Sequence, residues 1–517
     1  MSNSVAPINI AIEKNYDSEF CGSIPLHLVN LIQPHGVLIV LDKVNLRILQ
    51  ISENTGSFFD VPAEELLEKS LSEFLPEGQY ADIINKVKAH GNQEKIPFTL
   101  SFLIKGQKVP VTALILPQQD YVLVELEEYQ PSPDDSFVRL YQHIKYITSL
   151  LKQAGSYQEI AHVAAQELKL FTGFDRVLVY QFDPQWNGIV IAQAKEKDMD
   201  DYMGLRFPAS DVPKQARDLY FRNPYRLIPT REYTPVRLLP VINPLTQRFT
   251  DLSESNLRSV AKVHLEYLTN LNIIASMSLP IIIDNKLWGL ISCHHKTAKY
   301  PDYEMRSAME LMTGILSAQL EAKQREENMA LRVRLRNMHV KLMEQLYTFP
   351  SFVDGLLEGE SKVQELLSLT GVAIMYEGNV ATSGSTPGKQ EIKDLVSWLR
   401  RNRNKGLFST NTLPAEYPNS KAYKEIASGL VSLPINAEQG EFILGFRSEV
   451  TQTVNWGGNP DKAIQMEPDG KTYHPRNSFA TYQEVVKNTS LPWLEEELEA
   501  AETLRNAVLE KLIKERY

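Results

Sequence analysis

A charged and aromatic segment near the middle of the chain carries the side chains most suited to chemistry. In residues 205–228, LRFPASDVPKQARDLYFRNPYRLI, Asp211 stands among prolines and precedes several arginines and a tyrosine: Arg217, Tyr220, Arg222 and Arg226. Guanidinium groups match carboxylate and phosphate geometry, so this cluster suits an anionic ligand. A solvated helix face is the alternative, because charged residues at helical spacing also produce one.

A predicted helix over residues 255–272 adds a histidine and a further arginine to this candidate site. Its apolar face follows i, i+3 and i+4 spacing and is formed by Leu257, Val260, Ala261, His264, Leu268 and Leu271. Arg258 flanks this face and could reach an anion. Two interpretations of His264 stay open here, a core histidine with satisfied hydrogen bonds and a ligand-binding one.

Two predicted strands carry further polar side chains. Because side chains alternate along a strand, Ser276 and Ser278 lie on one side of the strand ASMSLPIIID. In the following strand, KLWGLISCHH, the same rule groups Trp288, Leu290, Ser292 and His294. Cys293 then faces the opposite side, where we expect an ordinary buried thiol.

The composition excludes several classes of protein. The 517 residues include two cysteines, Cys21 and Cys293, too few for a disulfide-rich fold or a zinc site built on thiols alone. The chain has no run of about 18 apolar residues and no secretory signal pattern at its start. Its net charge of −10 argues against nucleic-acid binding. We therefore expect a protein of the reducing cytoplasm that binds neither nucleic acid nor membrane.

The chain divides into three mixed blocks of short strands and helices, which predicts an α+β fold with antiparallel sheets. The first block spans residues 24–128. The second spans residues 138–320 and holds a long irregular segment at 199–253, where the charged cluster lies. The third spans about residues 350–491, with a glycine- and proline-bearing excursion at 456–479.

Two long helices are predicted. One joins the second and third blocks, and the other connects the chain to an output domain. Residues 302–347 contain no proline and one glycine, which predicts a helix of about 40 residues that forms a spine and could pair with a second copy. A final helix over residues 491–517 has apolar residues at a and d positions: Leu498, Ala501, Val508 and Leu512. Its pattern runs to Tyr517, so we expect an output domain beyond it.

Taken together, these segments resemble bacteriophytochromes, the red/far-red photoreceptors that bind biliverdin. The motifs that carry the resemblance are, in chain order, IPLHLVNLIQPHG after Cys21, FPASDVP, LRSVAKVHLEYL, SCHH, WGG and PRNSF. The resemblance covers essentially the whole chain and implies a PAS–GAF–PHY photosensory core. Its parts are an N-terminal extension at 1–23, PAS at 24–128, GAF at 138–320, PHY at 321–505 with a tongue at about 450–485, and an output-linking helix at 491–517.

The resemblance also implies how the chromophore is attached. In the family a cysteine ahead of the PAS domain forms a thioether to the A-ring vinyl side chain of biliverdin IXα, and Cys21 stands at that position. Relatives that use a GAF cysteine have it directly before the pocket histidine, where this chain has Val263, which favours biliverdin. The N-terminal segment is expected to pass through the long GAF loop in a figure-of-eight knot, with Ile32 at its centre.

The pocket roles carried over from the family cover the candidate residues found above. Asp211 offers its backbone carbonyl to the pyrrole nitrogens, His264 contacts the pyrroles through an ordered water, and His294 hydrogen-bonds the D-ring carbonyl. The D-ring is lined by Tyr180, Phe207 and Tyr267. The two propionates are held by Tyr220, Arg226, Arg258, Ser276 and Ser278.

The implied mechanism is photoisomerisation at the bond between rings C and D, followed by refolding of the tongue from hairpin to helix. Arg476 pairs with Asp211 in the red-absorbing state, and Ser478 replaces it in the far-red state. We predict a red-absorbing dark state and a homodimer. The predicted output domain is commonly a histidine kinase in the family, which would signal to a response regulator.

Two other classes of function are weighed against this one. In a regulator that binds a cyclic nucleotide, the arginines would hold phosphate, but Cys21 and the PRNSF motif would have no role. An enzyme would need a recognisable catalytic motif, and the chain has no P-loop, G-x-S-x-G, H-E-x-x-H or kinase glycine motif. The sequence therefore favours a sensory module that is not itself an enzyme.

Overall fold

The computed structural model describes residues 26–89, 95–129, 136–403, 406–466 and 473–516. The chain forms two compact units, the first made of residues up to 321 together with 455–482, and the second of residues 322–454 and 483–517. Within the described residues, no helix combines the length and apolar composition needed to cross a membrane. The predicted mixed α+β class with antiparallel sheets is confirmed.

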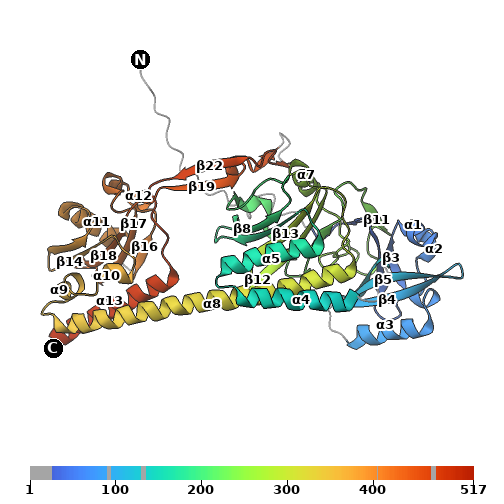
Figure 1. Cartoon of the computed structure of the whole chain (residues 1–517), viewed down its shortest axis with the longest axis horizontal. Helices are drawn as coiled ribbons and strands as arrows, with labels where there is room; N and C mark the ends of the chain where they lie inside the picture. The colour runs from blue at the N-terminus through green and yellow to red at the C-terminus, as the bar shows by residue number, and fades with distance from the viewer. Residues whose placement is uncertain (1–25, 90–94, 130–135, 404–405, 467–472, 517) are drawn as a thin grey trace, which may run out of the picture. The chain divides into compact units, whose positions relative to one another are not determined.

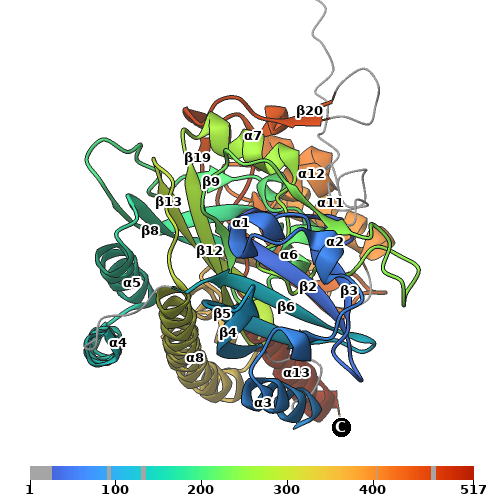
Figure 2. The same ribbon diagram turned by 90° about the vertical axis from the view of Figure 1, so that its right-hand side faces the viewer.

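The first unit begins with a seven-stranded sheet packed against short helices. Its strands in spatial order are β1 (Leu31–Ile32), β11 (Val236–Leu239), β3 (Ile48–Ser52), β2 (Gly36–Asp42), β6 (Tyr121–Glu128), β5 (Gln107–Pro117) and β4 (Ile96–Ile104). The helices are α1 (Thr55–Phe59), α2 (Ala63–Leu66) and α3 (Glu77–Ala89). Phe59, Leu66 and Ile83 of these helices share one buried core with the sheet, and Figure 2 shows the helices on the face of this sheet.

The N-terminal strand β1 lies between two parts of the long loop that follows in the sequence. On one side it pairs antiparallel with β11. On the other side the amide of Gln33 donates to the carbonyl of Leu257 over 2.7 Å, and that of Ser259 donates to Leu31 over 3.0 Å. Ile32 is completely buried. Contacts on both sides are expected of a segment that passes through the loop, and the threading itself stays a prediction.

The second sheet of this unit has eight strands. In spatial order they are β10 (Arg226–Ile228), β12 (Ala275–Ile283), β13 (Lys286–His295), β7 (Arg176–Phe182), β8 (Gly188–Lys195), β9 (Arg206–Phe207), β19 (Gln452–Gly457) and β22 (Thr481–Val486). One face is covered by α4 (Ser136–Gln153), α5 (Tyr157–Thr172) and the start of α8 (Tyr303–Thr348) (Figure 1). Local signals set the bounds of α5, because the Ser156 hydroxyl caps its start and Gly173 ends it with a φ of 62°.

The helix predicted over residues 255–272 is shorter than expected, and this part of the prediction was wrong. Helix α7 spans only Lys262–Asn270. Residues before it are extended, because Arg258 forms a β-bridge with Ile32 and the neighbouring amides pair with the N-terminal strand. The apolar face drawn through Leu257 and Val260 therefore does not exist as a helix face. A partner more than 200 residues away overrides the local helical pattern.

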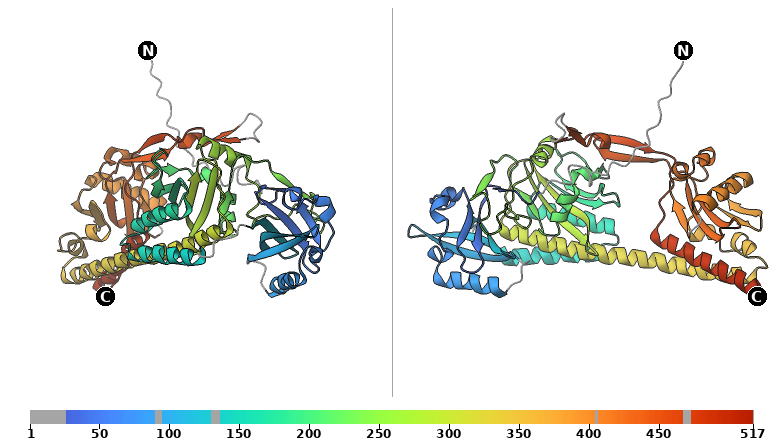
Figure 3. Two further views of the ribbon diagram at one scale, coloured as in Figure 1. Left: turned by 45° about the vertical axis from the view of Figure 1, so that its right-hand side comes forward. Right: turned by 180° about the vertical axis from the view of Figure 1, so that it is seen from behind.

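The predicted spine is confirmed and is longer than expected. Helix α8 is a single helix of 46 residues (Figure 3). The boundary between the two units falls inside it, between Glu321 and Ala322. Arg306, near its start, is completely buried and forms an ion pair with Glu127 of β6. This pair fixes the start of the helix to the first sheet.

The second unit is built on a five-stranded antiparallel sheet, whose strands in order are β15 (Asn379–Gly384), β14 (Gly371–Tyr376), β18 (Glu441–Arg447), β17 (Gly429–Asn436) and β16 (Phe408–Thr410). Its helices are α9 (Phe352–Leu357), α10 (Val363–Leu366), α11 (Lys389–Asn402), α12 (Leu413–Glu416) and α13 (Glu495–Arg516). Ala501, Leu504 and Val508 of α13 share a buried core with Leu342 and Leu346 of α8. The apolar stripe of the final helix is therefore covered, at least in part, by its own chain.

Candidate functional site

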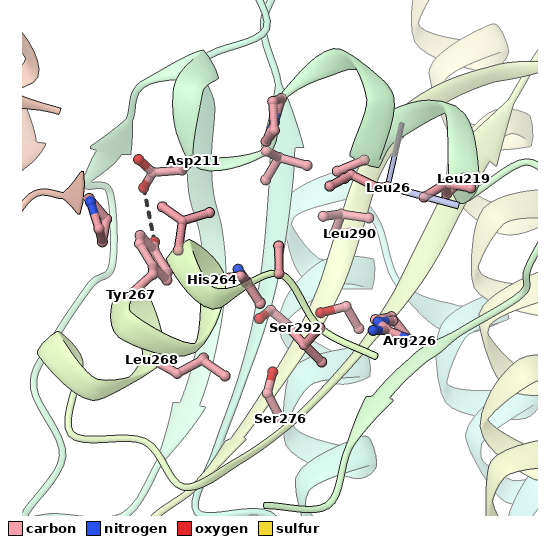
Figure 4. Close-up of a pocket in the computed structure, with 18 of the residues that line it drawn as sticks. Leu26, Asp211, Leu219, Arg226, His264, Tyr267, Leu268, Ser276, Leu290 and Ser292 are labelled. Atoms are coloured by element: carbon pink, nitrogen blue, oxygen red, sulfur yellow. Dashed lines mark hydrogen bonds between the residues drawn. The ribbon is translucent and has the colours of Figure 1, made fainter. Parts of the chain in front are cut away.

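The face of the eight-stranded sheet opposite α5 borders a cavity of about 440 Å³. The helices α6 (Lys214–Leu219) and α7 line the cavity opposite the sheet, as Leu219, His264 and Tyr267 show in Figure 4. All the pocket residues carried over from the family line this cavity: Tyr180, Phe207, Asp211, Tyr220, Arg226, Arg258, His264, Tyr267, Ser276, Ser278 and His294. Residues from separate strands, helices and loops are thus brought around one volume.

Two arginines supply positive charge to this cavity. Arg226 is the first residue of β10. Its Nη2 donates a hydrogen bond to the Ser259 carbonyl over 3.1 Å, while its Nη1 is buried without a partner among the described residues. Arg258, which is 6% exposed, likewise has a buried Nη1 without a partner there. Burial, and then the nearby charge of Arg226, lowers the pKa of Arg258 to about 9. Both guanidinium groups remain charged at neutral pH and are poised for anionic partners.

The other arginines of the charged cluster serve different purposes. The Arg217 guanidinium lies 4.3 Å from the centre of the Trp186 ring and donates to the Val212 carbonyl over 2.7 Å. Arg222 points to the surface, where it lies 3.3 Å from the Asp251 carboxylate. The helical spacing suggested one anion site for the whole cluster, but α6 ends at Leu219 and separates its members.

Strand alternation correctly placed most of the side chains on β12 and β13. Ser276, Ser278, Leu290, Ser292 and His294 line the cavity, whereas Cys293 lies in the apolar core on the opposite face.

Trp288 is the exception to this alternation. Ile281 pairs with Gly289 and Ile282 pairs with Leu287, so Trp288 is the extra residue of a β-bulge. Its side chain packs against the opposite core instead of lining the cavity. Grouping Trp288 with Leu290 was therefore wrong.

The histidines of the cavity are held in the neutral state. Burial, followed by the charge of Arg226, lowers the pKa of His264 to about 4. Burial also lowers the pKa of His294 well below its usual value, and the charge of Arg176 adds to this effect. At neutral pH each ring therefore has one donor and one acceptor nitrogen.

The excursion of the third block docks on the outer end of the cavity. Arg476 forms an ion pair with Asp211, and both side chains are buried. The hydroxyl of Tyr267 donates to the same carboxylate oxygen over 2.9 Å. The Arg476 guanidinium also lies 4.6 Å from the centre of the Phe479 ring. Burial raises the pKa of Asp211, although Arg476 and Tyr267 oppose that shift by stabilising the charged form.

Comparison with known proteins places this geometry in a family. The sequence profile described as "Phytochrome region" matches residues 335–516, "PAS fold" matches 21–129, and "GAF domain" matches 156–322. Cyanobacterial phytochrome B of Nostoc sp. is 38% identical over 97% of this chain and 67% of its own length. The chain belongs to the phytochrome family. A bacteriophytochrome of Pseudomonas aeruginosa is 30% identical over 98% of this chain and 67% of its own length.

Solved phytochrome structures have the same fold. The photosensory core module of Stigmatella aurantiaca phytochrome matches with a TM-score of 0.83 and 36% identity, over 97% of this chain and 98% of that one. A bacteriophytochrome from the photosynthetic bacterium R. palustris matches with a TM-score of 0.85 and 34% identity, over 96% and 99%. The chain is thus a phytochrome photosensory core, and it spans about two thirds of the length of the curated relatives named above.

Membership of the phytochromes implies a bilin chromophore, and the cavity fits one. A bilin carries two carboxylates on an apolar, conjugated body. The unpartnered nitrogens of Arg226 and Arg258 match the carboxylates, and the apolar cluster that includes Tyr180, Phe207 and Leu290 matches the body. A volume of about 440 Å³ lies within the usual range of ligand sites.

Close contacts account for the two glycines of the WGG motif in this phytochrome. A Cβ on Gly457 would lie 2.8 Å from ring carbons of Phe207, so only hydrogen fits where β19 pairs with β9. Gly458 has a φ of 98°, and a Cβ there would lie 2.3 Å from the Ser478 carbonyl oxygen. Close backbone approach, rather than turn flexibility alone, therefore requires both glycines.

We expect Gly457→Val to loosen the docked part of the tongue, residues 455–466 and 473–482. The added side chain would push against Phe207, and such overpacking costs roughly 1–3 kcal/mol. Amide hydrogen exchange of residues 455–458 should then accelerate by about tenfold or more, since each 1.4 kcal/mol is a factor of ten. Gly78→Ala, where the new Cβ has no neighbour within 4 Å, is the control and should change nothing in the tongue.

The buried neutral histidines predict acid lability of the apoprotein. An unfolded histidine binds a proton near pH 6.5, whereas His264 in the folded state does so only near pH 4. Stability is therefore lost as the pH falls from about 6.5 towards 4, by up to ~1.4 kcal/mol per pH unit for this one group. His264→Gln should reduce the fall in melting temperature between pH 7 and pH 5. An equal fall in the variant would contradict this prediction, and exposed His162→Gln is the control.

The remaining predicted residues are Cys21 and Ser478. Cys21 lies outside the described residues. Ser478 is exposed in the tongue, and its hydroxyl accepts the amide of Ala480 over 3.3 Å. Its predicted exchange with Arg476 belongs to another state and stays a prediction.

The cavity also contains residues that the sequence did not single out. Tyr202, in the irregular segment, packs edge-on against Phe207 at 5.6 Å between ring centres. Leu26 and Val29 line the cavity from the N-terminal segment. No periodicity marks any of these positions, because each comes from a loop or from a segment brought in by distant contacts.

Proposed function

We propose that this chain is the photosensory core of a red/far-red photoreceptor that binds biliverdin IXα in the cavity. The observation that carries the proposal is the pair of buried guanidinium groups of Arg226 and Arg258. Each has a buried nitrogen without a hydrogen-bond partner among the described residues, at one cavity otherwise rich in aromatic and aliphatic side chains. Two anionic side chains on one apolar ligand are what a bilin offers. Val263, where some relatives carry the attachment cysteine, supports biliverdin within this class.

Attachment is proposed through a thioether to Cys21. Leu26, the first described residue, lines the cavity. It follows Cys21 by five residues, and five residues of extended chain span at most about 18 Å. A thiol at position 21 can therefore reach a ligand in the cavity. Ile32, which is completely buried between β11 and Arg258, would hold the N-terminal segment in place.

When bound, biliverdin supplies light absorption and photoisomerisation at the bond between rings C and D. The chain's own groups hold and shape it. Neutral His264, through an ordered water, and the backbone carbonyl of Asp211 would accept hydrogen bonds from the pyrrole nitrogens and would stabilise the protonated ring system. Tyr180, Phe207 and Tyr267 would line the D-ring and leave it room to rotate, and His294 would hydrogen-bond its carbonyl in the dark state.

Signalling is proposed to pass through the tongue. The ion pair of Arg476 with Asp211 supports a red-absorbing dark state, because it is the pair expected there. Exchange of Arg476 for Ser478 would release the tongue from its strand pairing and allow it to refold as a helix. The change would reach α8 and α13 and then an output domain beyond Tyr517. We propose a cytoplasmic homodimer whose output, in the case of a histidine kinase, addresses a response regulator.

The absorption spectrum of the apoprotein mixed with biliverdin, before and after red illumination, tests this function. A strong red band that converts reversibly to a far-red band is the expected result. No red band, or a band that does not respond to light, would overturn the chromophore assignment and favour an anion-binding regulator instead.

We expect Cys21→Ser to abolish covalent attachment while preserving non-covalent binding. The wild-type chain should keep its chromophore after denaturation in sodium dodecyl sulfate, and the variant should lose it. Cys293→Ser is the matched control, since this thiol is completely buried in the opposite core and should have no part in attachment. Attachment that survives in Cys21→Ser would contradict the assignment.

A further inference from the structure

A buried arginine contacts one of the cavity histidines from behind. Arg176 begins β7 and is 1% exposed. Its Nη2 lies 3.0 Å from Nδ1 of His294, and its Nε lies 3.3 Å from the same atom. The guanidinium is itself held in place, because its centre lies 4.1 Å from the centre of the Tyr202 ring and its Nη1 donates to the Asp200 carbonyl over 3.2 Å.

The chemistry of this contact determines where the proton on His294 resides. A guanidinium group has only donors and stays protonated in proteins. Nδ1 of His294 must therefore act as an acceptor and carry no proton, so the neutral ring has its proton on Nε2. Ser292, on the other side of the ring, lies 3.0 Å from Nε2 but cannot make this choice, since a hydroxyl donates and accepts equally well.

We propose that Arg176 is a positioning residue that fixes His294 in its Nε2–H tautomer, so that the cavity presents a hydrogen-bond donor to a carbonyl oxygen of its ligand. This rests on the proposed function, in which that ligand is a bilin with a terminal lactam carbonyl. The same arginine makes a protonated His294 unfavourable, because two cations would then lie about 3 Å apart in a buried site. His294 therefore acts as a fixed donor and does not exchange protons.

The tautomer can be measured in the apoprotein by ¹⁵N magnetic resonance of ¹⁵N-histidine-labelled protein. The chain has ten histidines, and the His294 signals are assigned by their loss in His294→Gln. The wild-type chain should show a protonated Nε2 and an unprotonated, hydrogen-bonded Nδ1. In Arg176→Met the population ratio should shift towards the Nδ1–H form by about tenfold or more, as expected for loss of a charged hydrogen bond.

Two further variants separate positioning from a general packing role. Arg176→Lys keeps a cationic donor and should retain the Nε2–H form. Ser292→Ala removes the contact at the other nitrogen and should also retain it. The proposal is overturned if wild-type His294 carries its proton on Nδ1, and this test does not depend on the folding of any variant. It is also overturned if Arg176→Met leaves the ratio of the two tautomers unchanged. Because these spectra need no chromophore, failure to form a red band with biliverdin would instead overturn the proposed function.

Discussion

Replacing Asp211 with alanine is expected to release the tongue from the cavity. The variant leaves the Arg476 guanidinium in a site where its side chain is only 3% exposed, facing the rings of Phe207 and Phe479. Removing one partner of a buried ion pair costs roughly 3–5 kcal/mol, because the remaining charge is uncompensated. Amide hydrogen exchange of residues 474–480 should therefore accelerate by about two to four orders of magnitude.

The double variant shows whether the effect comes from the pair. Arg476→Met removes the stranded cation and fills a similar volume, so Asp211→Ala combined with Arg476→Met should exchange more slowly than Asp211→Ala alone. Glu266→Gln is the matched control, since its partner His474 lies 2.8 Å away in the same tongue but both side chains are 39% exposed. An exposed pair contributes only about 0.2–1 kcal/mol. Equal effects of Asp211→Ala and Glu266→Gln on the exchange rate would contradict the prediction that the buried ion pair of Asp211 holds the tongue.

Local periodicity predicted those parts of the fold that are stabilised locally. The strands of the first block and the long helix α8 came directly from alternation and from uninterrupted helical spacing. Alternation also separated Ser292 and His294 from Cys293, since both strands of that hairpin are regular near their open end. It failed at Trp288, where a bulge inserts one residue and reverses the side-chain direction.

The remaining errors have a non-local cause. Residues before Lys262 have a helical pattern but lie extended, since their backbone groups pair with the strand β1 from the other end of the first unit. No sequence pattern singles out Arg176, which is buried at the start of β7 because Tyr202 and His294 pack against it. Resemblance to a family found the pocket residues, but it gave no physical account of why Arg176 or Gly457 must be there.

Removal of the two cavity arginines is expected to have opposite effects on binding and on apoprotein stability. Each charged hydrogen bond to a propionate contributes about 1.5–3 kcal/mol, so Arg226→Met or Arg258→Met should weaken biliverdin binding by roughly 10- to 100-fold. Titrations in a Cys21→Ser background keep binding reversible. Biliverdin dimethyl ester, whose propionates are uncharged, should bind the Cys21→Ser protein more weakly than biliverdin does. This difference should disappear when Arg226→Met and Arg258→Met are combined in that background.

Without a chromophore the same two guanidinium groups repel one another and leave buried donors unpaired. Arg258→Met should therefore raise the melting temperature of the apoprotein while it lowers biliverdin affinity, as expected of a residue kept for function at a cost in stability. Arg222→Met, from the same segment but paired with Asp251 at the surface, is the control and should change neither quantity. If Arg258→Met weakened biliverdin and its ester equally and also lowered the melting temperature, the arginine would serve the fold and the anion site would lie elsewhere.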